Sequence, residues 1–291
     1  MLLPFPYPIT EIIPRRFSCR AYQKIPLAPE EVSQLEAALA AVHAGPLGSA
    51  LRFELALALE HDPQALHGLG TYGLIKDPAG FILGAMGPGK NNLEDFGYGL
   101  ETILLYATSL GIDSCWLGGN FTKSSFSRRI QLGRGETVPA VASIGYAVDE
   151  IRARDPLRQK VKSDTRLGWE KLFFAADFET PLSQAEAGAF AVALEMLRLA
   201  PSGHNYQPWR VIRDGSCFHF YLQRTPGYGP GSPMFLLLGV SDLQRMEIGI
   251  AMCHFDLAIG EAGLAGNWRV TKPAVHPPDR AYEYVVTWTA E

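Results

Sequence analysis

Two arginines and a serine alternate near the start of the chain, in the segment RFSCRAY (residues 16–22). If this segment is extended, Arg16, Ser18 and Arg20 all project to the same side, because side chains alternate along an extended backbone. Guanidinium and hydroxyl groups donate the charge-assisted hydrogen bonds that satisfy a phosphate. Read together with the two motifs described below, this alternating trio favours a ligand site over three unrelated surface side chains.

A second polar cluster, APSGHNYQPW, spans residues 200–209 and follows a helix-like pattern. Gly203 permits close approach of the backbone to a ligand, and the Asn205 amide offers both a donor and an acceptor. His204 can be read as an acid–base group, or as a polar residue that points to solvent or caps the turn. The Gln-Pro-Trp that ends the cluster is expected to enter a strand and pack there.

The elements that position these clusters occur twice in the chain. Apolar residues recur at helical spacing after Leu27 and again after Leu182, and a strand-like run follows each helix, at residues 52–60 and 209–214. The two helical patterns lie 155 residues apart. They are carried by Val32, Leu35, Leu39 and Val42 in the first copy, and by Phe190, Leu194 and Leu197 in the second.

A second pair of segments matches at nearly the same offset. Residues 97–116 match residues 249–268 with an offset of 152, and each segment reads as an apolar helix, a glycine stop and a turn into a tryptophan. β-rich segments follow both, at residues 140–147 and 282–290. We interpret the chain as a tandem duplication with its junction near residues 155–180, each copy having a small sheet flanked by helices.

The chain resembles the FMN-dependent nitroreductase family over nearly its whole length. Three motifs carry the resemblance: RFSCRAY, APSGHNYQPW and LGIDSCWLGG (residues 110–119). A protomer of this family carries each motif once, and each FMN touches both subunits of a homodimer. The resemblance implies an α+β nitroreductase-like fold, FMN as cofactor, and reduction of an electron-poor acceptor, such as a nitroaromatic or a quinone, with NAD(P)H.

The resemblance also implies roles for residues of the first half. Arg16 and Ser18 would hold the FMN phosphate, and Arg20 would face the pyrimidine edge of the ring, where a cation stabilises the reduced flavin. Arg154 matches the C-terminal phosphate-binding arginine of the family. A backbone N–H of the loop Leu117, Gly118 and Gly119 would face flavin N5, so no catalytic side chain is assigned.

The second half supplies the remaining contacts. By the same resemblance Pro201, Ser202, Gly203 and Asn205 would line the flavin from that side. Each copy has lost the motif that the other keeps: residues 45–53 lack the Asn and the Gln-Pro-Trp, and residues 171–175, 155 after the Arg-Ser motif, contain neither a Ser nor an Arg pair.

The chain therefore resembles the single-chain branch of the family, a fused pseudo-dimer that builds one flavin site from both halves. We expect copy one at residues 1–160 and copy two at residues 161–291, in a chain that is a monomer or a homodimer. The alternatives are a non-enzymatic flavin-binding or storage protein, and a specialised flavin reaction such as dehalogenation or flavin destruction. The motifs specify neither the acceptor nor the choice between NADH and NADPH.

Several other classes are disfavoured. A net charge of −4 offers no general basic surface for nucleic acid or membrane. GAMGPGKN (residues 84–91) nearly matches a phosphate loop, but Asn91 replaces the Mg²⁺-binding hydroxyl, so a nucleotide triphosphate site is disfavoured. Lys90 is expected at most at the edge of the flavin pocket. His254 and Asp256 are two apart on an apolar helix and no other histidine has metal spacing, so no metal site is expected. The four scattered cysteines, and the lack of a leader or an 18-residue apolar run, favour a cytoplasmic protein.

Overall fold

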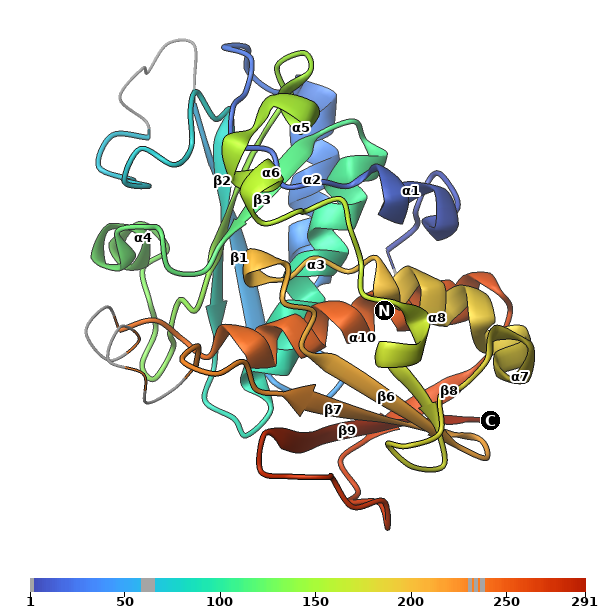
Figure 1. The fold of residues 1–291 in the computed structure, drawn as a ribbon. Coiled ribbons are helices and arrows are strands. Elements are labelled where there is room, and N and C mark those ends of the chain that lie inside the picture. Colours follow the sequence, from blue (N-terminus) through green and yellow to red (C-terminus); the bar gives the residue numbers. More distant parts are fainter. Residues whose placement is uncertain (1–2, 59–65, 230–231, 233–234, 236–238) are drawn as a thin grey trace.

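Two sheets with two long helices packed between them form the molecule (Figure 1). The computed structural model describes residues 3–58, 66–229, 232, 235 and 239–291. The end of the predicted strand at residues 52–60 therefore lies partly outside the described residues.

The first sheet has four antiparallel strands in the order β1-β2-β4-β3. All residues of β2 and β4 are buried, as expected for inner strands covered on both faces. The bounds are β1 (Leu51–Leu57), β2 (Gly80–Met86), β3 (Asp113–Leu117) and β4 (Val141–Gly145).

The second sheet has the order β5-β6-β7-β9-β8. Its last four strands repeat the order and the antiparallel pairing of the first sheet, while the short β5 adds parallel to β6. The predicted α+β fold with two copies is confirmed by this repeated topology. The bounds are β5 (Phe173–Ala175), β6 (Trp209–Asp214), β7 (Cys217–Gln223), β8 (Gly266–Arg269) and β9 (Tyr282–Ala290).

The two long helices, α3 (Asn92–Ser109) and α10 (Leu243–Glu261), cross in the middle of the molecule (Figure 1). Gly97 lies against the backbone of Met246, and Gly249 lies against the backbone of Glu94. These contacts are reciprocal under the 152-residue offset, as in an interface between two identical subunits. A Cβ at either glycine would overlap backbone atoms of the other helix, so the close crossing requires glycine at both positions.

Shorter helices cover the sheets and connect the copies. Helix α2 begins with a proline and two glutamates and buries Leu35, Ala38 and Leu39, so its apolar spacing predicted the buried face correctly. The remaining bounds are α1 (Ile9–Arg15), α2 (Pro29–Ala41), α4 (Lys123–Arg129), α5 (Ile151–Arg154), α6 (Pro156–Lys160), α7 (Gln184–Ala187) and α8 (Ala191–Arg198), with 3₁₀ turns at Trp169–Lys171, Gly188–Phe190 and Gly203–Asn205.

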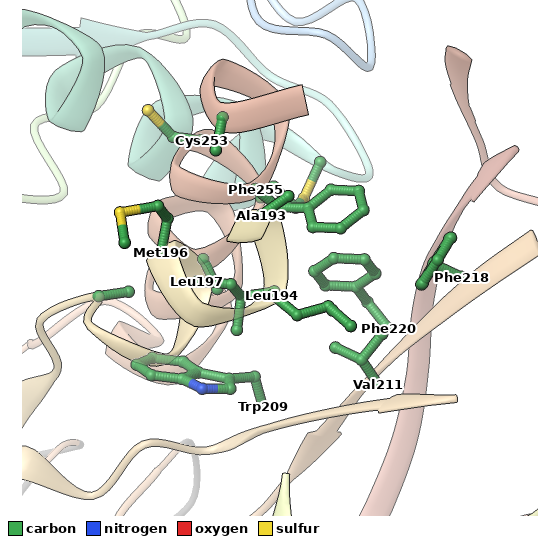
Figure 2. Close-up of a cluster of buried hydrophobic side chains, with 14 of the residues drawn as sticks. Ala193, Leu194, Met196, Leu197, Trp209, Val211, Phe218, Phe220, Cys253 and Phe255 are labelled. Carbon is green, nitrogen blue, oxygen red and sulfur yellow. The ribbon is translucent and has the colours of Figure 1, made fainter. Parts of the chain in front are cut away.

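The core of the second copy lies where α8 and α10 pack on β6 and β7 (Figure 2). Leu194 and Leu197 of α8 lie beside Trp209 of β6 and Phe220 of β7, all with no measurable exposure. The Gln-Pro-Trp segment therefore enters a strand and packs, as the sequence predicts.

One predicted correspondence is wrong. Phe173, 155 residues after Ser18, pairs with Val211 of β6, whereas Ser18 bridges Ser114 of β3. Strands β3 and β6 are not counterparts, because β6 repeats β1. Residues 171–175 therefore extend the second sheet at its opposite edge, and they do not form a degenerate copy of the Arg-Ser motif.

Candidate functional site

Two adjoining cavities lie between the copies and share Ser18, Ser163, Pro201 and Ser202 in their walls. We call the first, of about 150 Å³, the apolar cavity; its wall includes Trp116, Leu243, Met246, Glu247 and Ile250. We call the second, of about 280 Å³, the arginine cavity; its wall includes Arg16, Arg152, Arg158 and Arg166. Together they form one cleft to which both halves of the chain contribute.

The Arg-Ser segment runs along the free edge of β3 in extended form. Ser18 bridges Ser114, and the Cys19 N–H donates to the Ser114 carbonyl at 2.9 Å. Cys19 is fully buried on one side, and the alternate residues line the cleft on the other. Arg16 faces the arginine cavity, Arg20 faces the apolar cavity, and Ser18 lines both. The trio therefore borders one cleft, and Phe17 also lines the arginine cavity although alternation would place it on the Cys19 side.

Arg16 is held by a buried carboxylate on α3. Its Nε lies 3.2 Å from Glu101 Oε1, and its side chain is only 5% exposed. Glu101 also accepts from Trp116 Nε1 at 2.6 Å and lies 2.9 Å from His254 Nε2 of α10. Burial disfavours the charged form of Glu101, but Arg16, His254 and Trp116 together outweigh it and lower the pKa of this carboxyl. Arg16 is therefore fixed with Nη1 buried and without a partner among the described residues.

The arginine cavity carries more cations than anions. Asp164 pairs with Arg158 at 2.5 Å and with Arg152 at 3.4 Å. Arg166 donates to the Ser163 and Leu199 carbonyls, and its Nε is buried and unpaired among the described residues. Burial, and then the nearby Arg16, lower the pKa of Arg166 to about 10. A cavity lined by mutually repelling guanidinium groups favours a multiply charged anion.

Arg154 does not join this cluster, so the expectation that it belongs to the phosphate site is corrected. It ends the four-residue helix α5, its side chain is 74% exposed, and it pairs with Glu150 one turn earlier. Neither cavity includes it. Sequence reasoning missed Arg158 and Arg166, because both lie within the predicted junction near residues 155–180 and outside the three motifs.

The connection between the copies lines the cleft. Asp155 caps helix α6 by accepting from the Leu157 and Arg158 N–H groups, and it accepts from Arg20 Nη1 at 2.8 Å. Burial opposes ionisation of Asp155, but the bond from Arg20 prevails and lowers the pKa of its carboxyl. The helix cap therefore also fixes Arg20 beside the apolar cavity.

The second-half motif has two tasks, one of which the sequence did not predict. Pro201 and Ser202 line both cavities, and Gly203 lines the apolar one, while their contact with a flavin stays a prediction. Asn205 lines the arginine cavity, but its amide donates to the Lys162 and Thr165 carbonyls, so its side chain holds the connection in place.

The glycine-rich loop after β3 is only partly in the cleft. Gly118 lines the apolar cavity, and a Cβ there would lie 2.5 Å from Leu243 of α10. Leu117 is 1% exposed at the end of β3, and neither it nor Gly119 lines either cavity. A side chain at this position would therefore displace the end of the Leu243 side chain, which lines the same cavity.

Helix α10 supplies wall residues that the sequence motifs did not identify. Leu243, Met246, Glu247 and Ile250 face the apolar cavity at helical spacing. Glu247 is 4% exposed, and its Oε1 accepts the Gly203 N–H at 2.7 Å. The sequence signal that could have identified Glu247 is its acidic side chain between Met246 and Ile248 in an otherwise apolar helix.

The structure also shows the surroundings of the residues for which the sequence analysis weighed other roles. His204 is exposed, has a φ of 52° and contacts the Tyr206 and Tyr228 rings beside the apolar cavity. Lys90 is exposed and outside the cleft walls. His254 and Asp256 bond to different partners, Glu101 and Tyr98. Within the described part of the chain, no cluster of His, Cys, Asp or Glu is arranged for a metal ion, and no helix has the length and apolar character to cross a bilayer.

Comparisons with known proteins agree with this fold. The family model described as "Putative TM nitroreductase" matches residues 8–259. The solved structure of a protein described as a putative nitroreductase, from Thermotoga maritima MSB8, is 17% identical to this chain. The two structures match with a TM-score of 0.60 over 98% of this chain and 93% of that one. No curated protein matches the sequence.

Two further solved structures match about half of the chain. An oxidoreductase containing FMN is 20% identical with a TM-score of 0.42, over 53% of this chain and 85% of that one. A nitroreductase with bound FMN from Bacteroides fragilis NCTC 9343 is 21% identical with a TM-score of 0.37, over 50% of this chain and 90% of that one. Because the family model spans well over half of the sequence, the chain belongs to this nitroreductase family.

Proposed function

We propose that the chain is an FMN-dependent oxidoreductase that reduces an electron-poor acceptor, such as a nitroaromatic or a quinone, with NAD(P)H. The observation that carries this proposal is a cleft between the two copies in which buried guanidinium N–H groups lack partners at both ends. These are Arg16 Nη1 and Arg166 Nε at the arginine cavity, and Arg20 Nε at the apolar cavity, judged among the described residues.

The residues present fit FMN. A phosphate in the arginine cavity would satisfy Arg16 and Arg166, because buried donors left unpaired are costly and charge-assisted bonds to an anion are strong. Ser18 and Ser202 lie between the cavities and can donate hydroxyl bonds along the ligand. Trp116, Met246 and Ile250 offer apolar contacts to a flat ring in the apolar cavity.

In this arrangement FMN supplies the two-electron chemistry, and the chain supplies binding, orientation and electrostatics. Arg20, fixed by Asp155, places a positive charge at the ring end, where it favours an electron-rich ligand. Helix α10 and residues 201–203 close the other wall, which limits the access of water to the ring end. Free cysteines at all four positions are compatible with a cytoplasmic location for this activity.

The test is spectroscopic. The purified protein should carry a yellow chromophore that is released on denaturation and identified as FMN, and anaerobic NADH or NADPH should bleach it. Re-oxidation by a quinone or a nitroaromatic would then complete the turnover. A flavin that NAD(P)H does not bleach would instead support the binding or storage alternative, and a colourless protein that binds no added FMN would refute the proposal.

A further inference from the structure

Glu247 is a buried carboxyl group on the wall of the apolar cavity. It lies in the first turns of α10, and its Oε1 accepts the Gly203 N–H at 2.7 Å. Its Oε2 is buried and has no hydrogen-bond partner among the described residues. An unpaired buried carboxylate oxygen is costly, so this atom is expected to carry a proton or to meet a ligand in the cavity.

In the part of the chain that the structure describes, no cation is paired with this carboxyl. Arg20 lines the same cavity from the first copy, but it is ion-paired with Asp155 at 2.8 Å. Arg245 on the same helix is bonded to Glu94. The remaining nearby titratable groups are Asp242 at the start of α10, the Tyr228 hydroxyl beside Gly203, and His204, which is exposed at the cavity wall.

This environment favours the neutral acid. Burial, together with the negative charge of Asp242, raises the pKa of Glu247 to about 8. At neutral pH the folded protein therefore holds a proton on this side chain. Because Oε1 accepts the Gly203 N–H, the proton belongs on Oε2, the oxygen that has no hydrogen-bond partner among the described residues.

The first copy contains a counterpart without this spare oxygen. Asp95, 152 residues earlier on α3, also holds the loop that precedes the strand in its own copy. Its Oδ1 accepts the Leu47 N–H at 2.7 Å and its Oδ2 accepts the Ser49 N–H at 2.8 Å. Holding the loop thus occupies both oxygens of Asp95 but only one of Glu247, which leaves Glu247 Oε2 available for chemistry at the cleft.

We propose that Glu247 gives the proton on Oε2 to the acceptor that is reduced against the ring, at the wall of the apolar cavity. This inference rests on the proposed function, in which NAD(P)H is the reductant and supplies a hydride equivalent, two electrons and one proton. A quinone needs one further proton to become a hydroquinone, and a nitro group needs one further proton to become a nitroso group and water. The Glu247 O–H bond breaks, a bond from that hydrogen to the acceptor oxygen forms, and the resulting carboxylate regains a proton from solvent.

The first test compares Glu247→Gln with the wild type. Glutamine keeps the size of the side chain and an acceptor for Gly203, but it has no acidic proton. General acids typically accelerate a step by about 100- to 10,000-fold, so kcat for the acceptor should fall by at least about 100-fold, while the Kd for FMN stays within about twofold. The wild-type kcat should also fall above about pH 8, and the variant should lack this titration.

The second test does not depend on activity. Infrared spectra of the FMN-loaded wild type should show the carbonyl band of a protonated carboxylic acid that titrates near pH 8. Glu247→Gln should lack this band. The matched control, Asp95→Asn, changes the counterpart carboxyl in the other copy and should retain both the band and the pH profile.

The outcomes separate this inference from the proposed function. If the wild type reduces acceptors and Glu247→Gln reduces them equally fast, or if the acid band does not depend on residue 247, the proton-donor role is overturned and the proposed function stands. If the band titrates as expected but no acceptor is reduced by NAD(P)H, the proposed function fails and the role falls with it.

Discussion

At the scale of single residues, the cleft depends on guanidinium groups whose orientation is set by buried acids. Glu101 fixes Arg16, Asp155 fixes Arg20, and Asp164 pairs with Arg158. Arg20 lines the apolar cavity, and Arg16 and Arg158 line the arginine cavity. Charge alone does not select the site residues, because Arg154 has the same charge and forms an exposed ion pair with Glu150.

The first prediction concerns Arg16. Arg16→Ala should weaken FMN binding about 10- to 150-fold, because one charge-assisted hydrogen bond contributes ~1.5–3 kcal/mol. Arg154→Ala and Lys171→Ala should leave affinity within about twofold, since both side chains are exposed and outside the cleft. Fluorescence titration of FMN into the three apo-variants measures this, with thermal unfolding as the check on Arg16→Ala. Equal losses in all three would show that the arginine cavity is not the phosphate site.

The second prediction concerns pH and Glu247. Its pKa of about 8 in the folded state exceeds its ordinary value, so between about pH 4.5 and 8 the folded chain holds a proton that the unfolded chain has lost. The free energy of unfolding should therefore fall as pH rises through this window, by at most about 1.4 kcal/mol per pH unit from this group. Urea unfolding of FMN-free protein at pH 5, 6, 7 and 8 measures the slope. A slope as steep in Glu247→Gln as in the wild type would assign it to other groups.

At the scale of elements, the close contact between the crossing helices α3 and α10, called the joint below, aligns the two halves of the cleft. Helix α10 supplies one wall of the cleft. Helix α3 supplies Glu101, which forms an ion pair with Arg16 of the opposite wall. The reciprocal pairs Glu101–His254 and Thr102–Cys253 lie one turn beyond the two glycine contacts. A change in the crossing should therefore disturb stability and FMN binding together.

The third prediction concerns the glycines of this joint. Gly249→Ala places a Cβ against the Glu94 backbone, which cannot move aside as a side chain can. Overpacking of this kind typically costs ~1–3 kcal/mol, and the free energy of unfolding should fall by at least this amount. Gly87→Ala is the control, because the nearest atom to its Cβ would be the Ala50 Cβ at 3.7 Å, an ordinary contact. Urea unfolding that ranks the two variants equally would contradict a close helix crossing.

At the scale of the whole molecule, the two copies are equivalent in topology but unequal at their sheet edges. The free edge of β3 is covered by the Arg-Ser segment, while its counterpart β8 pairs only with β9 among the described strands. The counterpart of the apolar cavity wall is a hollow of about 350 Å³ beside Asn91, Glu94 and Val270. There Arg245 is bonded to Glu94, and no extended Arg-Ser segment adjoins it in the described part of the chain.

The fourth prediction follows from this inequality: each chain binds one FMN. The arginine cavity has no counterpart among the described residues around the second hollow, so a phosphate there would meet the paired Glu94–Arg245 and the carboxylate of Glu283. Denaturing saturated protein and measuring released flavin per chain decides the number. A ratio near two would show that the second hollow is also a site.

The fifth prediction tests whether one chain suffices. Arg16 to Arg20 come from the first copy and Pro201 to Asn205 from the second, so residues 1–160 and 161–291 expressed separately should each fail to retain FMN. Their mixture should recover binding, weakened because the fused chain holds its halves at an effective concentration of order millimolar. Retention of FMN by residues 1–160 with wild-type affinity would refute the shared site.

Much of this protein follows from local sequence. Periodic apolar spacing predicted the main helices and strands, the internal offsets predicted the repeated sheet, and the alternation of Arg16, Ser18 and Arg20 predicted their common side. These features depend on residues close in the chain, whose spacing alone fixes which side chains share a face.

Tertiary structure decided what spacing cannot encode. The sheet edge that residues 173–175 extend, the exclusion of Arg154, and the entry of Arg158, Arg166 and Glu247 into the cleft all depend on contacts between distant segments. The local sequence around an arginine in a polar stretch does not show whether its side chain is exposed to solvent or lines a cavity. Only the folded chain brings Glu247 of α10 to the Gly203 N–H and leaves its second oxygen without a partner in the described part of the protein, because burial and hydrogen-bond satisfaction are properties of the packed molecule.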